Sequence, residues 1–314
     1  MAESAPTPQG IPTGYGPSGR ASAPPVQRIR LTFEKGAPLR FIGHLDLARM
    51  WERACRRAKL PLAYSQGYTP HPRLTFAAPL ALGATGSGEL MDMYLRDSLS
   101  IHEILQRIRP QLPAGCAVPA AVEVPMADPA VTALVRRATY NIEVSAAAPG
   151  TGNVEGEIDT ASPAAQGSRW SRADSIESAT RSEAADEHEP DQVPWRPAAE
   201  RLRPPAAEPP LPNTSEITNR IAALLAAKAL PRQRVRDGRT VPYDLRPLVL
   251  DVWIGHGGPM QAPDGWPRLG MLLRLDGAGT GRPEEVAAAL GLRARTVHRV
   301  CLALEGDVAT YVRA

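Results

Sequence analysis

Apolar residues follow two different spacings in the first patterned part of the chain, residues 28–59. Residues 28–33 alternate apolar and polar side chains, and this period of two is typical of a half-buried strand. Residues 44–59 repeat apolar side chains at the spacing of a helix, and the residues on that face are Leu47, Trp51, Ala54 and Ala58. The pattern therefore predicts a strand followed by an amphipathic helix.

The next apolar runs continue this succession of elements. The expected strands are 74–80, 90–95 and 117–124, and the expected helix is 101–108. Ser98 or Ser100 can cap that helix, and Pro110 limits it. The glycine-rich GATGSG of 83–88 is expected to be a turn, because a phosphate-binding loop needs a helix directly after its glycines. The order strand, helix, strand, strand, helix, strand is the split βαβ arrangement of a ferredoxin-like domain.

The C-terminal part repeats this order of elements if one long segment is treated as an insertion. The expected strands are 138–144, 247–254, 269–275 and 297–304, and the expected helices are 215–228 and 283–290. We therefore predict an α+β fold of two tandem ferredoxin-like units. The first unit is expected to span 26–126, and the second to combine 127–145 with 214–314.

Two segments lack both spacings and are expected to be disordered. Residues 1–25 are rich in Pro, Gly, Ser and Ala, and residues 146–213 hold ten prolines and twelve acidic residues against six arginines. Such compositions bury too little apolar surface to offset the entropy of ordering. In the second segment, here called the acidic linker, Trp170 and Trp195 are either incidental or part of a short partner-docking motif.

Composition excludes several classes of protein. No run of about 20 apolar residues is present, and the N-terminus lacks a basic segment followed by an apolar run, so we expect a cytoplasmic protein that does not bind membranes. The three cysteines are odd in number and far apart, which indicates neither a disulfide framework nor a CxxC metal site. We expect Cys55, Cys116 and Cys301 to be small buried apolar residues.

Charge is unevenly distributed, although the net charge is only +3. Residues 28–73 hold ten Lys and Arg against three Asp and Glu, which makes the segment a candidate anion-binding surface. Guanidinium groups suit phosphate recognition, and the expected basic residues of the site are Arg49, Arg53, Arg56, Arg57, Lys59 and Arg73. Tyr64 and Tyr68 in the adjoining loop can stack on the bases of single-stranded RNA. The alternatives are a solvated charged helix face and tyrosines that serve as core or hinge residues.

Three other polar residues of this segment are candidates for catalysis. His44 and Asp46 lie at the predicted start of the helix, and His71 lies between two prolines that restrict its backbone. They either form a paired site near the basic helix or serve as packing and capping residues. We predict no metal site, because these ligands meet only if the loop folds back and no other ligand spacing supports them.

A long segment, residues 41–83, contains four short motifs. They are HLD at 44–46, ERACRRA at 52–58, YSQGYTPHPR at 64–73 and PLALG at 79–83. With these motifs the chain resembles the bacterial radical SAM-linked protein family, a family of unknown function, and weaker echoes occur at 241–249 and 281–286. Tyr68 and Thr69 stand where Phe and Asn are usual. The resemblance implies an accessory role beside a radical SAM enzyme, and an iron–sulfur cluster and S-adenosylmethionine are expected in that partner.

A radical SAM enzyme holds its cluster through a CxxxCxxC triad, and this sequence contains none. We therefore expect no cofactor in this chain. The predicted function is a non-catalytic accessory module that presents RNA or another anionic substrate to a separate radical SAM enzyme. The alternative is an RNA-processing or RNA-modifying enzyme that uses His44 and Asp46 itself. A third hypothesis is an assembly factor that binds no nucleic acid.

Overall fold

The computed structural model describes most of the two patterned parts of the chain. The described residues are 24–66, 70–147, 210–236, 239–255, 268–277 and 279–307. Residues 1–23 of the predicted tail and 148–209 of the acidic linker lie outside these ranges, and so do Trp170 and Trp195.

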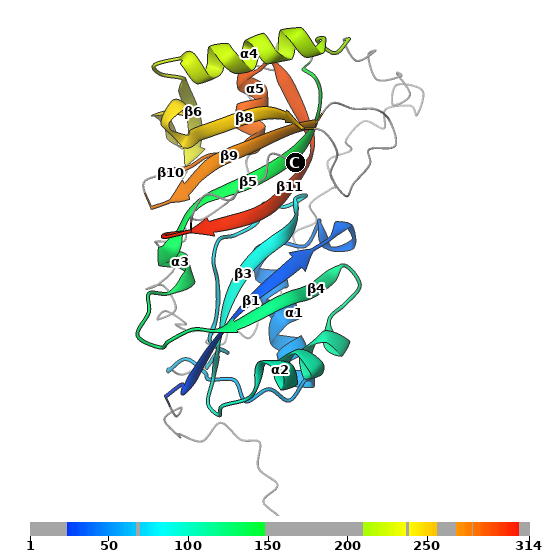
Figure 1. The fold of residues 1–314 in the computed structure, drawn as a ribbon, viewed down its shortest axis with the longest axis vertical. Helices are drawn as coiled ribbons and strands as arrows, with labels where there is room; N and C mark the ends of the chain where they lie inside the picture. Colours follow the sequence, from blue (N-terminus) through cyan, green and yellow to red (C-terminus); the bar gives the residue numbers. More distant parts are fainter. Residues whose placement is uncertain are drawn as a thin grey trace, which may run out of the picture.

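The N-terminal half consists of antiparallel strands covered by helices. Its elements are β1 (Gln27–Lys35), α1 (His44–Arg57), β2 (Leu74–Phe76), β3 (Thr85–Leu95), α2 (Ile101–Ile108) and β4 (Cys116–Glu123). The strands lie in the order β4–β1–β3–β2, and neighbours are antiparallel (Figure 1). Bounds agree with the sequence pattern within about two residues, except that β2 is shorter and β3 is longer. Ser100 caps α2 by accepting a hydrogen bond from the Glu103 N–H at 3.2 Å.

The C-terminal half repeats much of this arrangement. Its elements are α3 (Val131–Leu134), β5 (Val135–Ala146), α4 (Thr214–Ala226), β6 (Pro231–Arg236), β7 (Arg239–Asp244), β8 (Val249–Gly255), β9 (Arg268–Asp276), β10 (Gly279–Thr280), α5 (Pro283–Ala289) and β11 (Leu292–Leu304). Short 3-10 helices lie at Ala37–Leu39, Arg109–Gln111 and Arg246–Leu248. The strand order is β8–β9–β5–β11 with antiparallel neighbours, and β6 and β7 form a separate hairpin that the apolar pattern did not predict.

Strands β3 and β11 join the two halves. The start of β3 pairs in parallel with β11, with His298 opposite Thr85 and Arg299 opposite Gly86. Within the described residues this pairing makes one nine-stranded mixed sheet. The α+β class is therefore confirmed. Two separate ferredoxin-like units in tandem are not confirmed, because the sheet is continuous across both halves.

Only the start of the GATGSG segment lies in a turn, where Gly83 has a φ of 84°. Residues 85–88 belong to β3, and a Cβ at Gly88 would lie 2.6 Å from the Val300 carbonyl oxygen and 2.9 Å from Cys301 Cα. Glycine inside a strand often marks the close approach of another backbone. For residues 85–88 the turn interpretation was wrong. Gly88 serves a strand contact instead, because the lack of a side chain at this residue allows β11 to pack against β3.

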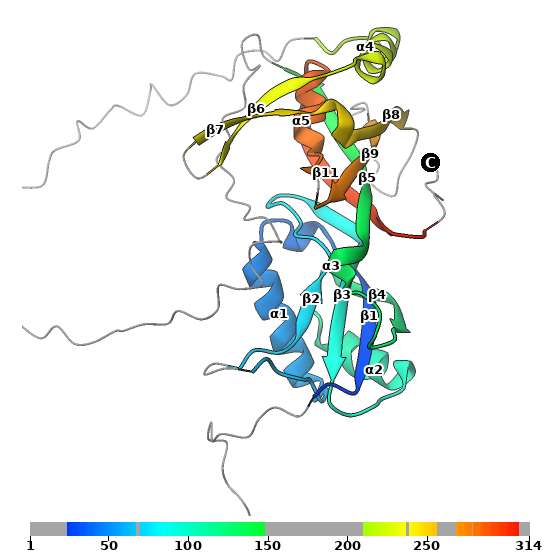
Figure 2. The same cartoon turned by 90° about the vertical axis from the view of Figure 1, so that its left-hand side faces the viewer.

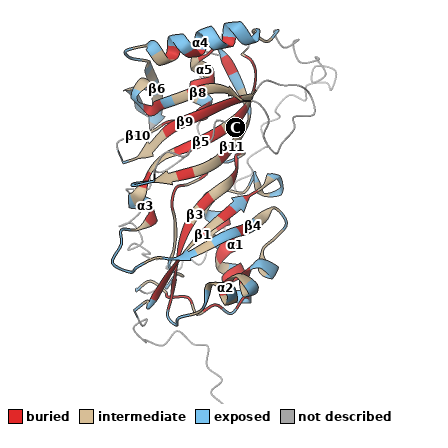
Figure 3. Cartoon of the chain, viewed as in Figure 1, coloured by how far each residue is buried: buried red, intermediate tan, exposed pale blue. Residues whose placement is uncertain are grey.

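Helix α1 is packed through the apolar face that the sequence predicts. Leu47, Trp51, Ala54 and Ala58 are all buried. Figure 3 shows buried residues along β1 and β3 as well. The Trp51 ring meets the Phe33 ring of β1 edge to face, with centroids 5.3 Å apart. A second core lies in the C-terminal half and contains residues from both sides of the acidic linker, such as Val144 and Ile217. The two halves therefore have separate cores under one sheet.

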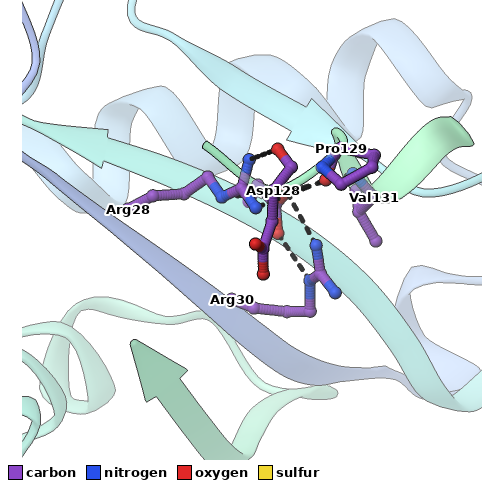
Figure 4. Close-up of polar contacts among 6 residues, drawn as sticks. Arg28, Arg30, Asp128, Pro129 and Val131 are labelled. Atoms are coloured by element: carbon purple, nitrogen blue, oxygen red, sulfur yellow. Dashed lines mark hydrogen bonds and ion pairs between the residues drawn. The ribbon is translucent and has the colours of Figure 1, made fainter. Parts of the chain in front are cut away.

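Part of the predicted basic surface is buried. Arg28 and Arg30 of β1 approach Asp92 of β3, whose side chain is fully buried, and Arg30 Nε lies 2.7 Å from Asp92 Oδ1. Arg28 also donates to the backbone carbonyls at 128–129, and the Val131 N–H donates to Asp92 Oδ2 (Figure 4). These contacts tie the segment before β5 to the N-terminal sheet. Arg28 and Arg30 are therefore structural residues, and an anion-binding role for them is excluded.

Candidate nucleic-acid interface

Helix α1 presents its arginines on the side opposite the core. Arg49, Arg53, Arg56 and Arg57 are exposed, and they occupy the sector of the helix that faces away from its buried residues. Figure 2 shows α1 on the outer side of the N-terminal strands. The arginine face defined by these four residues therefore runs along the surface of the molecule.

Contacts within the described residues neutralise only part of this charge. Arg49 Nη1 lies 3.2 Å from Asp46 Oδ1 in an exposed pair, and Arg57 Nη2 donates to the Gln111 carbonyl at 2.6 Å. The side chains of Arg53 and Arg56 make no hydrogen bond or ion pair with the described residues. Exposed ion pairs contribute little, so Arg49 also remains available to a polyanion.

Further cations gather at the C-terminal end of α1. Lys59 is exposed and has a φ of 52°, in the left-handed region, so the chain turns sharply just after the helix. Arg107 of α2 donates to the Lys59 carbonyl at 3.4 Å, although it also pairs with Glu103. Positive charge is favoured near the carbonyls that end a helix. Two helices therefore contribute to the same basic region.

The loop after α1 places its candidate residues in different environments. Tyr64 is half-buried, packs against the N-terminal core and forms a backbone bridge with Pro72. Arg73 is exposed, and its guanidinium lies 4.5 Å from the ring centroid of Tyr94. Tyr68 lies outside the described residues. The packing of Tyr64 favours a core role over base stacking, whereas Arg73 extends the basic surface beyond α1.

The three candidate catalytic residues have different surroundings. His44 begins α1 and packs edge-on against Phe76, with ring centroids 5.3 Å apart. His71 lies in the loop after α1, where its backbone N–H donates to Ser65 Oγ at 3.0 Å and its carbonyl accepts from the Ser65 N–H at 2.8 Å. Asp46 is exposed and pairs with Arg49. The described residues contain no group of three His, Cys, Asp or Glu that could hold a metal ion.

Sequence reasoning missed a buried ion pair between the two halves. Arg299 of β11 is 2% exposed, and its Nε and Nη2 both donate to the Glu89 carboxylate of β3, the first at 2.7 Å. Arg299 also donates to the backbone carbonyls of Ala78 at 3.0 Å and Pro79 at 3.2 Å. A bidentate pair of this kind is among the strong contacts available to arginine. The signal in the sequence was a single arginine within the apolar pattern of a predicted strand.

Lys35 lies in the same buried region. It is 1% exposed and donates to the carbonyls of Arg40 at 3.3 Å and Ile42 at 3.1 Å. Burial lowers the pKa of Lys35, Glu89 opposes this shift, and Arg299 adds to it. Burial also lowers the pKa of the nearby His44, and the charges of Arg299 and Lys35 lower it further. His44 is therefore a poor phosphate-binding cation at neutral pH, and Lys35 is withdrawn from the anion-binding surface.

His298 completes the contact between β3 and β11. Its Nδ1 lies 2.8 Å from Thr85 Oγ1, and its Nε2 lies 3.1 Å from Ser87 Oγ. Ser87 Oγ also donates to the Val300 carbonyl at 3.0 Å, so this serine contacts both the side chain and the backbone of β11. The three side chains hold the two strands together.

The β6–β7 hairpin is the second feature that the apolar spacing did not reveal. It is rich in arginine, and the residues between its strands are Asp237 and Gly238, a strong sequence signal for a two-residue hairpin turn. Residues 237–238 lie outside the described residues. Turn chemistry was therefore the signal that could have predicted this element, and the sequence analysis did not use it.

Comparison with protein-family models gives a match to most of the chain. A family model described as an uncharacterized protein conserved in bacteria, DUF2344, matches residues 28–262. The matched range includes α1, the loop after it and the β6–β7 hairpin. A search of curated proteins gave no match. No helix among the described residues is both long and apolar enough to cross a membrane. A cytoplasmic location stays a prediction.

Proposed function

The chain belongs to the DUF2344 family of uncharacterized bacterial proteins, and we propose that it is a non-catalytic accessory module that binds RNA or another anionic substrate through α1. The exposed arginine face carries this proposal. Arg53 and Arg56 point away from the core, and their side chains form no hydrogen bond or ion pair with the described residues. Arginine suits phosphate groups because its planar donors match their oxygens.

We further propose that the chain works beside a separate radical SAM enzyme. The resemblance of residues 41–83 to radical SAM-linked proteins supports this partner, about which the family match says nothing. Burial raises the pKa of Cys55 and of Cys116 to about 12, which keeps both thiols protonated and poor as metal ligands. The iron–sulfur cluster and S-adenosylmethionine are therefore expected in the partner. Cys116 and Cys301 are only partly buried, which differs from the expected full burial.

The strand orders support a finer proposal about the fold. In the N-terminal half the order across the sheet is β4–β1–β3–β2, and in the C-terminal half it is β11–β5–β9–β8. Along the chain, each half has a helix after its first strand, β1 or β5, and another after its third strand, β3 or β9. Both are consistent with the split βαβ arrangement. We propose two ferredoxin-like units that share one sheet, with the acidic linker and the β6–β7 hairpin inserted in the second.

Fluorescence anisotropy with a labelled single-stranded RNA tests the arginine face. We expect Arg53→Gln with Arg56→Gln to weaken binding about tenfold at physiological salt, since two phosphate contacts and the counterions that they release are lost. The slope of log affinity against log salt should decrease by about 1.4, at about 0.7 for each phosphate contact on a single strand. The matched control replaces Arg220 and Arg293, exposed arginines of the C-terminal half, and should bind like the unmodified protein.

Two outcomes would contradict this proposal. If the unmodified protein binds no RNA at low salt, where electrostatic binding is strongest, RNA is not the substrate. If the purified chain cleaves or modifies the RNA, and His44→Ala abolishes turnover with binding intact, the protein is an enzyme in its own right.

A further inference from the structure

The β6–β7 hairpin stands apart from the large sheet. In the described part of the chain, β6 and β7 pair only with each other, from Pro231 opposite Asp244 to Arg236 opposite Arg239. Figure 2 shows the hairpin projecting from the same side of the molecule as α1. The hairpin adds no strand to the sheet, so continuity of the sheet does not explain its presence.

Contacts with α5 hold the hairpin in a defined direction. The Arg234 guanidinium lies 4.2 Å from the Tyr243 ring centroid, and its Nη2 lies 3.5 Å from Glu285 Oε2 on α5. Tyr243 in turn packs against the C-terminal core. A two-stranded hairpin alone is marginally stable in water. These contacts therefore make β6–β7 a supported projection with a fixed base.

The remaining surface of the hairpin suits a polyanion. Arg239 is exposed at the tip, and Arg232 is half-exposed closer to the base. Val241 is 42% exposed on the same face as Arg232 and Arg239, because residues paired across an antiparallel hairpin share a face, whereas Val235 lies on the opposite face. The carboxylate of Asp244 is engaged by the Leu230 N–H at 2.7 Å. Among the described residues no third strand pairs with the outer edges of β6 and β7, and the backbone N–H groups of such an edge can bind phosphate oxygens.

We propose that the β6–β7 hairpin is a second RNA contact, and that one single-stranded RNA spans the arginine face of α1 and the hairpin. This inference rests on the proposed function, because α1 is the first contact. Arg232 and Arg239 bind phosphates, and the exposed Val241 between them meets the apolar face of a base. Two contacts on one strand strengthen binding only when the RNA is long enough to reach both.

Binding of oligouridylates of two lengths tests the inference. A labelled 6-mer is short enough to lie along α1, whose 14 residues span about 21 Å at 1.5 Å per residue, whereas a 20-mer can reach further. We expect Arg232→Gln with Arg239→Gln to weaken the 20-mer about tenfold and to leave the 6-mer within about twofold. The double lysine variant at the same positions keeps the charge and should retain most of the 20-mer affinity, and the Arg220 and Arg293 control should be unchanged.

The outcomes separate this inference from the proposed function. If the 20-mer loses affinity in the Arg53 and Arg56 variant but not in the hairpin variant, α1 is the RNA site and the second contact is wrong. If the hairpin variant weakens both lengths equally, the two-contact arrangement is wrong. If neither RNA binds the unmodified protein, the proposed function itself fails. Thermal unfolding of each variant identifies any loss that is due to misfolding.

Discussion

Replacing Glu89 by Gln removes the carboxylate that neutralises Arg299 between the two halves. Their side chains are 4% and 2% exposed, with Arg299 Nε 2.7 Å from Glu89 Oε1. In the variant Arg299 stays charged, because a guanidinium does not lose its proton in proteins. Its remaining acceptors, the backbone carbonyls at 78–79, the Tyr140 hydroxyl and the amide oxygen of the new glutamine, are all neutral. Lys35 loses a nearby anion as well, and its pKa, which burial already lowers, should fall further.

The expected cost is a large part of the stability of the protein. Removing one partner of a buried ion pair costs about 3–5 kcal/mol. Domains unfold with a free energy of about 5–15 kcal/mol, so this one substitution takes a substantial share. With an m-value of about 2–3 kcal/mol/M in urea, the midpoint of unfolding should fall by about 1–2 M.

Urea denaturation followed by circular dichroism measures this change. The matched control is Glu305→Gln, which breaks the exposed pair with Arg136 and should cost less than about 1 kcal/mol. Replacing Glu89 by Leu and Arg299 by Met together removes both charges and should cost less than Glu89→Gln alone. Equal midpoint shifts for Glu89→Gln and Glu305→Gln would refute the reasoning, since burial would then make no difference to the pair.

Two further predictions concern the same contact between strands. Gly88→Ala places a Cβ 2.6 Å from the Val300 carbonyl oxygen, so β3 and β11 must separate, and we expect urea denaturation to show a loss of about 1–3 kcal/mol. Gly277→Ala meets open space and is the control, and similar losses for both would contradict this account. Burial lowers the pKa of His298 below its ordinary 6.5, so its contribution to stability is complete above that pH and is lost as the pH falls through the lower folded value. The unfolding free energy should fall between about pH 7 and pH 5, and His298→Gln should make this fall smaller. His44, whose pKa is also lowered by burial, contributes to the fall that is left in the variant. The same pH dependence in the variant and the unmodified protein would argue against a contribution of His298.

The sequence was sufficient for α1 because local spacing records which side of an element is buried. Leu47 and Trp51 recur at helical spacing, and they face the core whatever the details of the strands beneath them. The same spacing places Arg53 and Arg56 on the opposite side, so the candidate surface could be predicted as well. What these arginines bind stays a prediction.

The sequence was insufficient where distant segments meet. Arg299 and Glu89 are 210 residues apart, and no local pattern states that the two strands pair. Gly88 was interpreted as part of a turn because turn residues and residues at a close strand contact have the same composition. Arg28 and Arg30 were counted as surface charge because alternation alone does not show that Asp92 and the segment before β5 cover that face.

The segment that resembles radical SAM-linked proteins contributes to the joint between the halves as well as to the surface. Its residues Ala78 and Pro79 accept hydrogen bonds from Arg299, which ties the loop after β2 to β11. Just before it, the Arg40 carbonyl accepts from both the buried Lys35 and the Gly83 N–H, the latter at 2.8 Å. A strand of RNA that touches α1 and β6–β7 requires these elements to stay at one spacing. Helix α1 belongs to one half and the hairpin to the other. The pairing of β3 with β11 and the buried Glu89–Arg299 ion pair can therefore hold α1 and the hairpin at a constant distance.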